Sequence, residues 1–396
     1  MAEDKGAAGV RVGVGDGEGV AESVPKSYPL YSSVLLRAGA RVQQGRAQGG
    51  GVLDGRVKVD ASGPLSRLPL VKSALQMFDG QLSVYADSEK LCLSTWIPPI
   101  PSRAFSRLAD SRLWAVLGRR TPDQVTISIT EECPNRCAHC ALPNSGNKLH
   151  LSPETVKGII GQILDMGTTL VIFDGGEPAL YRELPELVAA VDDRAISTLF
   201  TSGAGFTAAL ARRLKEAGLY AVNVSLDSPV ETEHDAMRGR GGVFSEAMQA
   251  IENALAAGLL VDLYVVLRRE NMPHLESFHE LARRMGVHEL TFFEVVCTGR
   301  WSERQNIALL PADHARLAEF VLSAGAPRIF SVPEAYKRFG CFAATSWLHI
   351  TPAGEVYPCS CYPESWGSIL SEPIKKIWGR MRAFPYKKSK VCPMRK

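Results

Sequence analysis

Between residues 125 and 296 short apolar runs alternate with longer amphipathic ones, and this alternation is the strongest constraint on the fold. The strand-like runs are VTISIT (125–130), TLVIFD (169–174), STLFTS (197–202), YAVNVSLD (220–227), LVDLYVVL (260–267) and ELTFFEVV (289–296). Strands that alternate with helices of about ten to fifteen residues form parallel βα units with right-handed crossovers. Because six units are fewer than the eight of a closed barrel, the pattern predicts an α/β fold, either a partial (β/α)6 TIM-like barrel or an open parallel sheet. In either case ligands bind at the carboxyl ends of the strands.

The flanking sequence predicts smaller units. The first fifty residues are rich in Gly, Ala, Arg and Val without a period, so we interpret them as disordered or loosely packed. The next part predicts an N-terminal α+β extension, with a hairpin that turns at 87–90 and a helix that is capped by Ser102 and ends near Leu117. The last part reads as a β-hairpin (SWLHITPAGEVYPCSCYP) and a terminal helix (EPIKKIWGRMRAF). The predicted units are therefore 1–50, 51–120, 121–309 and 310–396.

The composition excludes several classes of protein. The chain has 396 residues, 45% of them hydrophobic and 22% charged, which is typical of a globular protein with two or three domains. Its net charge of +3 indicates neither a nucleic-acid partner nor an acidic tail. No apolar run approaches the roughly 18–20 residues of a membrane span, and the N-terminus lacks the apolar core of a signal peptide. We therefore expect a cytoplasmic protein.

Cysteines gather in two groups. The total of nine is odd, so complete disulfide pairing is impossible, and a reducing cytosol disfavours bridges in any case. Seven of them fall into clusters of soft ligands, which suggests bound metal. The clusters are Cys133, Cys137 and Cys140, and Cys341, Cys359, Cys361 and Cys392.

The first cluster, Cys133-x3-Cys137-x2-Cys140, directly follows the first predicted strand. Three thiolates on one loop can hold three irons of a [4Fe-4S] cube, which leaves the fourth iron open for chemistry. The alternatives are a zinc site and a redox-inert structural site.

One βα unit later comes FDGGEPAL, at the end of the second strand. Gly175 and Gly176 let the backbone turn sharply and approach a ligand closely. Glu177 can present a carboxylate or carbonyl groups to a cationic amine, and Pro178 suits the start of a helix. On its own this run is also compatible with a plain strand-to-helix turn.

The two motifs together resemble the radical S-adenosylmethionine (radical SAM) superfamily over about residues 120–300, and His139 also fits that family. The resemblance implies that S-adenosylmethionine chelates the open iron, that reductive cleavage gives a 5′-deoxyadenosyl radical, and that this radical abstracts a hydrogen atom from the substrate. The cofactor performs the difficult step, and the protein orients it and excludes water.

The resemblance extends to residues at the ends of later strands. It implies that Ser202, Ser225, Asp227 and Arg238 lie near the cofactor, although Ser202 stands where relatives often carry Asn. Arg238 would meet the carboxylate of S-adenosylmethionine with its fork-shaped donor group. Asp227 and Arg238 are also compatible with a plain local ion pair. Cys297, at the end of the sixth strand, is a candidate hydrogen-atom donor or a buried apolar thiol.

The second cysteine group resembles the SPASM or Twitch extension, because Cys341 is followed by twelve residues, Gly354, four residues and Cys359. The glycine permits a turn between two strands that bring the thiolates together. The resemblance implies one auxiliary [4Fe-4S] cluster, with Cys341, Cys359 and Cys392 as ligands. Cys361 is either a fourth ligand or a buried thiol. A tetrathiolate zinc site is the alternative.

The segment TWIPPIPSRAFSRLADSRLWAVLGRR (95–120) mixes apolar side chains with five arginines. One interpretation is a surface for peripheral contact with a membrane or with a hydrophobic substrate. The other is a helix that packs on the barrel and leaves its arginines in solvent.

The sequence as a whole predicts an enzyme that functionalises a C–H bond of a bulky substrate. A ribosomal peptide is the first candidate, for crosslinking, oxidation or epimerisation; an isoprenoid or other lipid and a porphyrin or cofactor precursor follow. Reduced ferredoxin or flavodoxin is the expected electron donor. The alternatives from other classes are a non-catalytic iron–sulfur electron-transfer protein and a structural protein with two zinc sites.

Overall fold

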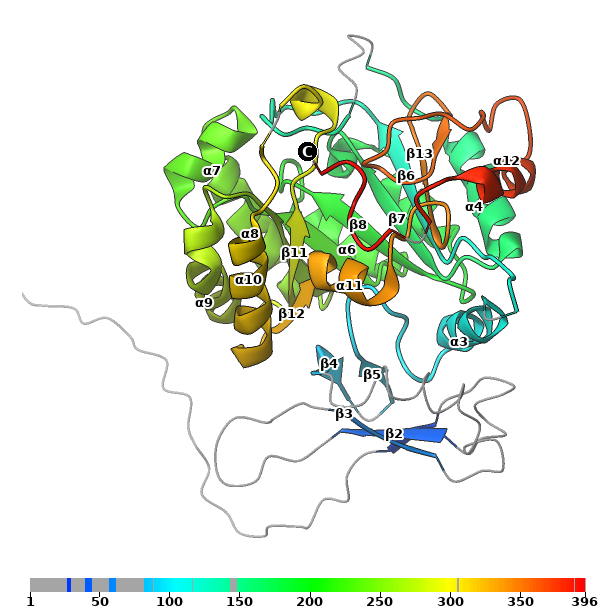
Figure 1. The fold of residues 1–396 in the computed structure, drawn as a ribbon, viewed down its shortest axis with the longest axis horizontal. Coiled ribbons are helices and arrows are strands. Elements are labelled where there is room, and N and C mark those ends of the chain that lie inside the picture. Colours follow the sequence, from blue (N-terminus) through cyan, green and yellow to red (C-terminus); the bar gives the residue numbers. More distant parts are fainter. Residues whose placement is uncertain are drawn as a thin grey trace, which may run out of the picture.

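A nine-stranded, mostly parallel sheet organises the computed structural model of the chain (Figure 1). The structure describes residues 27–29, 40–44, 57–61, 82–87, 89–115, 117–142, 148–304, 306–387 and 389–395. The strand order is β12-β11-β10-β9-β8-β7-β6-β13-β14, which does not return to its start, so the sheet is an open, partial barrel. The α/β fold class predicted from the alternation is confirmed.

All six predicted barrel strands form and lie side by side in chain order, each parallel to the next. They are β6 (Gln124–Thr130), β7 (Leu170–Gly175), β8 (Ile196–Thr201), β9 (Ala221–Ser225), β10 (Leu260–Leu267) and β11 (Glu289–Glu294). The helices that cover them are α4 (Pro153–Met166), α5 (Leu184–Ala189), α6 (Ala208–Glu216), α7 (Glu231–Arg238), α8 (Val243–Ala256), α9 (Leu275–Met285) and α10 (Pro311–Ser323). Short 3-10 turns lie at Pro178–Leu180, Met272–His274, Gly299–Trp301 and Met381–Ala383.

Residues beyond the sixth strand extend the sheet at both edges. β12 (Arg328–Ser331) pairs in parallel with β11, and β13 (Trp347–Ile350) crosses to the other edge and pairs in parallel with β6. β14 (Val356–Tyr357) returns antiparallel to β13 as the predicted hairpin. Two helices follow β12 in the chain, α11 (Val332–Phe339) and α12 (Ile374–Arg380). The sequence did not predict β12, α7 or α11, because elements of four to eight residues show little periodicity.

The segment before the barrel closes the end where the strands begin. The predicted hairpin is present as β4 (Tyr85–Ala86) and β5 (Leu91–Cys92). The predicted helix is α3 (Arg103–Ala115), and Ser102 Oγ accepts the N–H of Phe105 at 3.0 Å, as an N-cap should. In the described residues no helix is long and apolar enough to cross a membrane.

α3 is packed on the barrel and leaves part of its surface in solvent. Arg112 pairs with Asp123 just before β6 at 3.1 Å, and Arg107 donates to the carbonyl of Leu164 at 2.5 Å. Phe105 is buried, whereas Trp114 is 49% exposed. Contact of α3 with a membrane stays a prediction.

Most of residues 1–50 and much of 51–81 lie outside the described residues. The part of residues 1–81 that the structure does describe includes a three-stranded antiparallel sheet of β1 (Ser27–Pro29), β2 (Ala40–Gln44) and β3 (Val57–Ala61). The interpretation of 1–50 as disordered or loosely packed and the four domain boundaries stay predictions.

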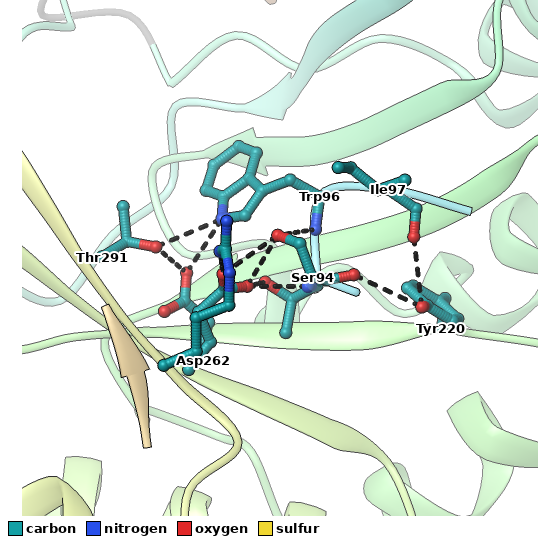
Figure 2. A network of polar contacts seen from close by, with 9 residues as sticks. Ser94, Trp96, Ile97, Tyr220, Asp262 and Thr291 are labelled. Carbon is teal, nitrogen blue, oxygen red and sulfur yellow. Dashed lines mark hydrogen bonds and ion pairs between the residues drawn. The ribbon is translucent and has the colours of Figure 1, made fainter. Parts of the chain in front are cut away.

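Polar contacts seal the floor of the barrel (Figure 2). The Trp96 indole N–H donates to Asp262 Oδ2 and Thr291 Oγ1, both at 3.2 Å. The buried carboxylate of Glu289 accepts hydrogen bonds from the Thr95 N–H at 2.7 Å and from the Ser94 hydroxyl at 2.9 Å. Arg328 of β12 completes this network with an ion pair to Glu289. The floor therefore links the segment before the barrel to the starts of β10, β11 and β12.

Substituting Glu289 by Ala should destabilise the protein. Glu289 is fully buried and Arg328 nearly so, so the variant leaves a buried guanidinium without its counter-charge. Removing one partner of a buried pair costs about 3–5 kcal/mol. We expect the free energy of unfolding in urea to fall by this amount, whereas Glu186→Gln, at an exposed pair with Lys157, should change it little. Equal stability of the Glu289→Ala variant and the wild type would show that the floor network is not needed.

Candidate active site

Two glycines let β7 press against the start of the cysteine loop. Gly175 has a φ of 139°, and a Cβ there would lie 2.4 Å from the carbonyl oxygen of Thr130. A Cβ on Gly176 would lie 2.2 Å from the carbonyl oxygen of Glu132. The N–H of Gly176 and the N–H of Glu177 donate to those same two oxygens, each at 2.7 Å. Only residues without a side chain permit this approach.

Glu177 is fully buried, and its carboxylate points into the protein. One oxygen accepts from the Thr201 hydroxyl at 2.7 Å and from the Ala179 N–H at 3.2 Å. The other accepts from the N–H and the hydroxyl of Ser202 at 2.8 and 2.5 Å. Burial raises the pKa of Glu177, and the hydrogen bonds from Ser202 and Thr201 oppose that rise. The sequence left the Glu177 carboxylate and backbone carbonyl groups as alternative partners for a cationic amine. This network uses both oxygens of the carboxylate, so the backbone carbonyl groups are the option that it does not use.

Ser202 connects Glu177 to the cysteine loop. Asn135, between the first two cysteines, donates its side-chain N–H to Ser202 Oγ at 2.9 Å. Its own oxygen accepts from Arg240 at 2.9 Å, and Arg240 also pairs with Glu246. Sequence reasoning missed Asn135 and Arg240; the only local signal was a short polar side chain inside the cysteine motif. Ser202 is thus a structural partner of the loop even though it replaces the Asn of relatives.

Backbone contacts hold the rest of the loop. The N–H groups of Arg136 and Ala138 donate to the last carbonyls of α7 at 2.9 and 2.8 Å. On the other side the N–H of Arg300 donates to the carbonyl of Cys140 at 3.0 Å. The Gly299 before it has a φ of 52°, and a Cβ there would lie 2.1 Å from that carbonyl oxygen. Three cysteines are therefore presented at the carboxyl ends of the barrel strands on a loop that is fixed on both sides.

The predicted pair of Asp227 and Arg238 is present and lies against this loop. Arg238 Nε is 2.7 Å from Asp227 Oδ2, and Arg238 Nη1 is 3.7 Å from Cys137 Sγ. His139 Nε2 is 3.5 Å from the other oxygen of Asp227. Burial alone would raise the pKa of Asp227, but Arg238 and His139 outweigh it and hold this pKa at about 2. The carboxylate therefore stays ionised and keeps Arg238 aimed at the cysteines.

The four C-terminal cysteines also come together, and all are buried. Cys359 and Cys361 are close enough to share a hydrogen bond, which lowers the pKa of Cys361. Burial raises the pKa of Cys392, and the charges of Cys361 and Cys341 raise it further. Cys361 lies with the other three and is not apart from them. In the described residues, no group of three or more Cys, His, Asp or Glu side chains is arranged to hold a single metal ion. A four-iron cluster binds each cysteine through a different iron, so its thiolates need not converge on one point.

The chain's last residues are tied to the end of β11. Arg395 Nε is 2.7 Å from the carboxylate of Glu294, and His314 Nε2 is 3.5 Å from the same oxygen. The N–H of Cys297 donates to the carbonyl of Met394 at 2.9 Å. This anchoring brings Cys392 to the other three cysteines. The Cys297 thiol itself is buried and donates a hydrogen bond to the carbonyl of Arg304 at 3.1 Å. It does not line the cavity described next, and this placement does not favour Cys297 as a donor of a hydrogen atom to a substrate radical.

One cavity of about 1640 Å³ connects both cysteine groups. Its wall includes Cys133, Cys137, Cys140, Cys341 and Cys361. Of the residues predicted to bind the cofactor, the wall includes Gly175, Gly176, Pro178, Ser202, Ser225 and Arg238, whereas Glu177 and Asp227 support it from behind. Deeper in the barrel the wall is aromatic, with Trp96, Phe200, Tyr264, Phe293 and Phe330.

Comparison with known families matches both halves of this arrangement. Residues 127–282 match the model of the radical SAM superfamily, and residues 341–394 match the model of an iron–sulfur cluster-binding domain, SPASM. The chain carries a radical SAM domain and a SPASM domain. The predicted resemblance is thereby confirmed, and so are its cofactors: a [4Fe-4S] cluster with one open iron, S-adenosylmethionine and an auxiliary [4Fe-4S] cluster.

Among curated relatives, the chain is 24% identical over 294 residues to an AdoMet-dependent heme synthase of Methanosarcina barkeri, a match that covers 66% of this chain and 84% of that protein. It is 28% identical over 282 residues to a PqqA peptide cyclase of Rhizobium meliloti, covering 66% and 75%. Among solved structures, SuiB of Streptococcus suis bound to its precursor peptide SuiA superposes with a TM-score of 0.59 at 16% identity, covering 72% of this chain and 73% of that one. This last likeness shows a shared fold.

The donors at both sites fit iron–sulfur clusters. Both sets consist of cysteine thiols, the ligands that such clusters take. Burial raises the pKa of Cys133 to about 11, so the thiol is protonated at neutral pH without a metal and would release its proton to solvent when a metal binds. Cys133, Cys137 and Cys140 would hold the radical SAM cluster, and Cys341, Cys359, Cys361 and Cys392 the auxiliary one.

Glu177→Gln should loosen the cysteine loop. A glutamine has one accepting oxygen, and its NH2 group would face donors of Ser202 or Thr201, so at least one buried donor loses its acceptor. Such a loss costs about 1–3 kcal/mol. We expect a lower free energy of unfolding and a lower iron and sulfide content after anaerobic reconstitution. Glu216→Gln, at an exposed position of α6, is the matched control. Wild-type iron content and stability in the Glu177→Gln variant would contradict this account.

Proposed function

We propose that this protein cleaves S-adenosylmethionine reductively and abstracts a hydrogen atom from an unactivated C–H bond of a substrate held in the cavity. The observation that carries the proposal is that a single cavity is walled by both cysteine groups. When bound at the first group, the cluster and S-adenosylmethionine supply the 5′-deoxyadenosyl radical. A substrate in the same cavity then lies within reach of both metal sites.

The residues of the chain have distinct tasks in this scheme. Gly175 and Gly176 let backbone carbonyls approach the amine of S-adenosylmethionine. Arg238, held by Asp227, offers a fork-shaped donor for its carboxylate. The loop contacts of Asn135 and Arg300 fix the cluster relative to the barrel. The aromatic wall excludes water from the position where a carbon radical would form.

A peptide is the first candidate substrate. A relative at 28% identity is named for the cyclisation of the PqqA peptide, and SuiB, which shares the fold, has been solved with a precursor peptide. A porphyrin or related cofactor precursor is the second candidate, because other relatives at 24% and 28% identity are named heme synthase and Fe-coproporphyrin III synthase. A lipid substrate stays a prediction, as do ferredoxin or flavodoxin as electron donor.

The auxiliary site is proposed to transfer electrons. Cys361 lies with the other three cysteines, and four protein ligands would leave no iron open for direct contact with the substrate. An electron released when the substrate radical is oxidised could then leave through this site.

Removing each of the two cysteine groups should have a different effect on the cleavage of S-adenosylmethionine. Cys133→Ala/Cys137→Ala/Cys140→Ala and Cys341→Ala/Cys359→Ala/Cys392→Ala should each lose about four of about eight irons, one cubane each. Only the first variant should stop the formation of 5′-deoxyadenosine from S-adenosylmethionine and dithionite, because only the first group leaves an iron open. Iron analysis and chromatography of the products measure both. A wild-type protein that contains both clusters but forms no 5′-deoxyadenosine would instead support an electron-transfer protein.

Deuterium transfer distinguishes the substrate classes. Perdeuterated PqqA and SuiA peptides and a deuterated coproporphyrin would be incubated separately with the reduced holoenzyme. Mass spectrometry of 5′-deoxyadenosine should show deuterium with a peptide if the peptide proposal holds. Deuterium from the porphyrin alone would favour the second candidate.

A further inference from the structure

Asp174 places a carboxylate inside the cavity, directly before the Gly175–Gly176 turn. It stands in register with Ser128 of β6, so both side chains point to the same face of the sheet, and both line the cavity. Ser128 Oγ donates to Asp174 Oδ1 at 2.6 Å. In the described ranges Ser128 is the one hydrogen-bond partner of this carboxylate. The second oxygen is therefore open to whatever enters the cavity.

Among the described residues, no lysine or arginine is near enough to shift the pKa of Asp174, which responds to burial and to Ser128. Two cations of the cavity wall, Arg238 and Arg112, pair elsewhere, with Asp227 and Asp123. The titratable groups of the same wall include Asp123, Glu131, His139, Lys148, Tyr336 and Tyr357, and also Tyr264 from β10 and His349 from β13. Burial raises the pKa of Tyr264 well above its usual value and lowers that of His349 to about 4, so both stay neutral near pH 7.

Burial raises the pKa of Asp174 to about 7, with the Ser128 hydrogen bond opposing the rise. At neutral pH the group is therefore poised between its two forms. A carboxylate ionised in an apolar space needs a charged or strongly donating partner. Since the described chain provides only the Ser128 hydroxyl, a cationic ligand in the cavity would favour the ionised form of Asp174.

We propose that Asp174 and Ser128 form a cation-accepting subsite, which receives a protonated amine, amidinium or guanidinium carried on an apolar or aromatic part of the substrate. The apolar part packs against the neighbouring aromatic wall of Phe200, Tyr264 and Phe293. The inference rests on the proposed function in one respect, that the substrate occupies this cavity. For a peptide it selects a basic side chain or a free amino terminus next to an apolar residue.

Benzamidine tests the subsite because it joins an aromatic ring to a permanently protonated amidinium. Its binding to the reduced, anaerobic holoenzyme would be measured by calorimetry with S-adenosylmethionine bound. We expect about tenfold tighter binding near pH 8 than near pH 6, because a group with a pKa of about 7 goes from about one-tenth to about nine-tenths ionised over this interval. Neutral benzamide should show no such dependence.

Three variants make the test specific. Asp174→Asn should weaken benzamidine binding at least tenfold near pH 8 and abolish its pH dependence. Ser128→Ala should shift the dependence to higher pH, since it removes the hydrogen bond that lowers the pKa. Asp165→Asn, at an exposed aspartate of α4 that pairs with Arg194, should bind like the wild type.

Several outcomes would overturn the inference: no benzamidine binding near pH 8, binding that Asp174→Asn leaves unchanged, or binding that appears only when S-adenosylmethionine is omitted. The last result would assign the carboxylate to the ammonium group of the cofactor. Formation of 5′-deoxyadenosine, measured in parallel without substrate, reports on the proposed function separately. Loss of benzamidine binding in Asp174→Asn, with binding retained in Asp165→Asn, would support the subsite.

Discussion

The close approach of β7 to the start of the cysteine loop fixes the geometry of the whole site. Gly175 and Gly176 lie so near the carbonyls of Thr130 and Glu132 that no side chain could be accommodated. Paired hydrogen bonds between the same backbone atoms hold this contact. The cysteines and the mouth of the cavity are both placed relative to this one contact between two neighbouring strands.

Buried ion pairs secure the other parts of the barrel. Asp227 with Arg238 lies at the mouth, Glu289 with Arg328 at the floor, and Glu294 with Arg395 at the C-terminal segment. The last two pairs join segments that are distant in sequence, and in all three each charge is compensated, as burial requires. Asp174 differs, since its partner in the described chain is only a hydroxyl. A buried carboxyl group with a raised pKa that lines a cavity is a candidate for a functional site.

The cavity relates this architecture to the two kinds of relative. Heme synthase and PqqA peptide cyclase act on substrates of very different shape, and both are matched over about two thirds of this chain. The shared part supplies the cofactors and the barrel. The motifs common to both kinds of relative therefore do not by themselves indicate the substrate of this chain.

The sequence by itself determined the six barrel strands, most of the helices between them and the cofactor motifs. Strand and helix periodicity, the Ser102 cap and the cysteine spacings are local patterns, each readable within a few residues, and the structure contains all of them. The Asp227–Arg238 ion pair was one of two interpretations that the sequence left open. The tertiary structure alone decided the pairing of β13 with β6, the inward turn of the Glu177 carboxylate and the Asn135–Ser202 contact. It also set Asp174 opposite an aromatic wall and tied Arg395 to Glu294. These depend on residues tens to hundreds of positions apart, whose approach follows from sheet register and packing and leaves no periodic trace in the chain.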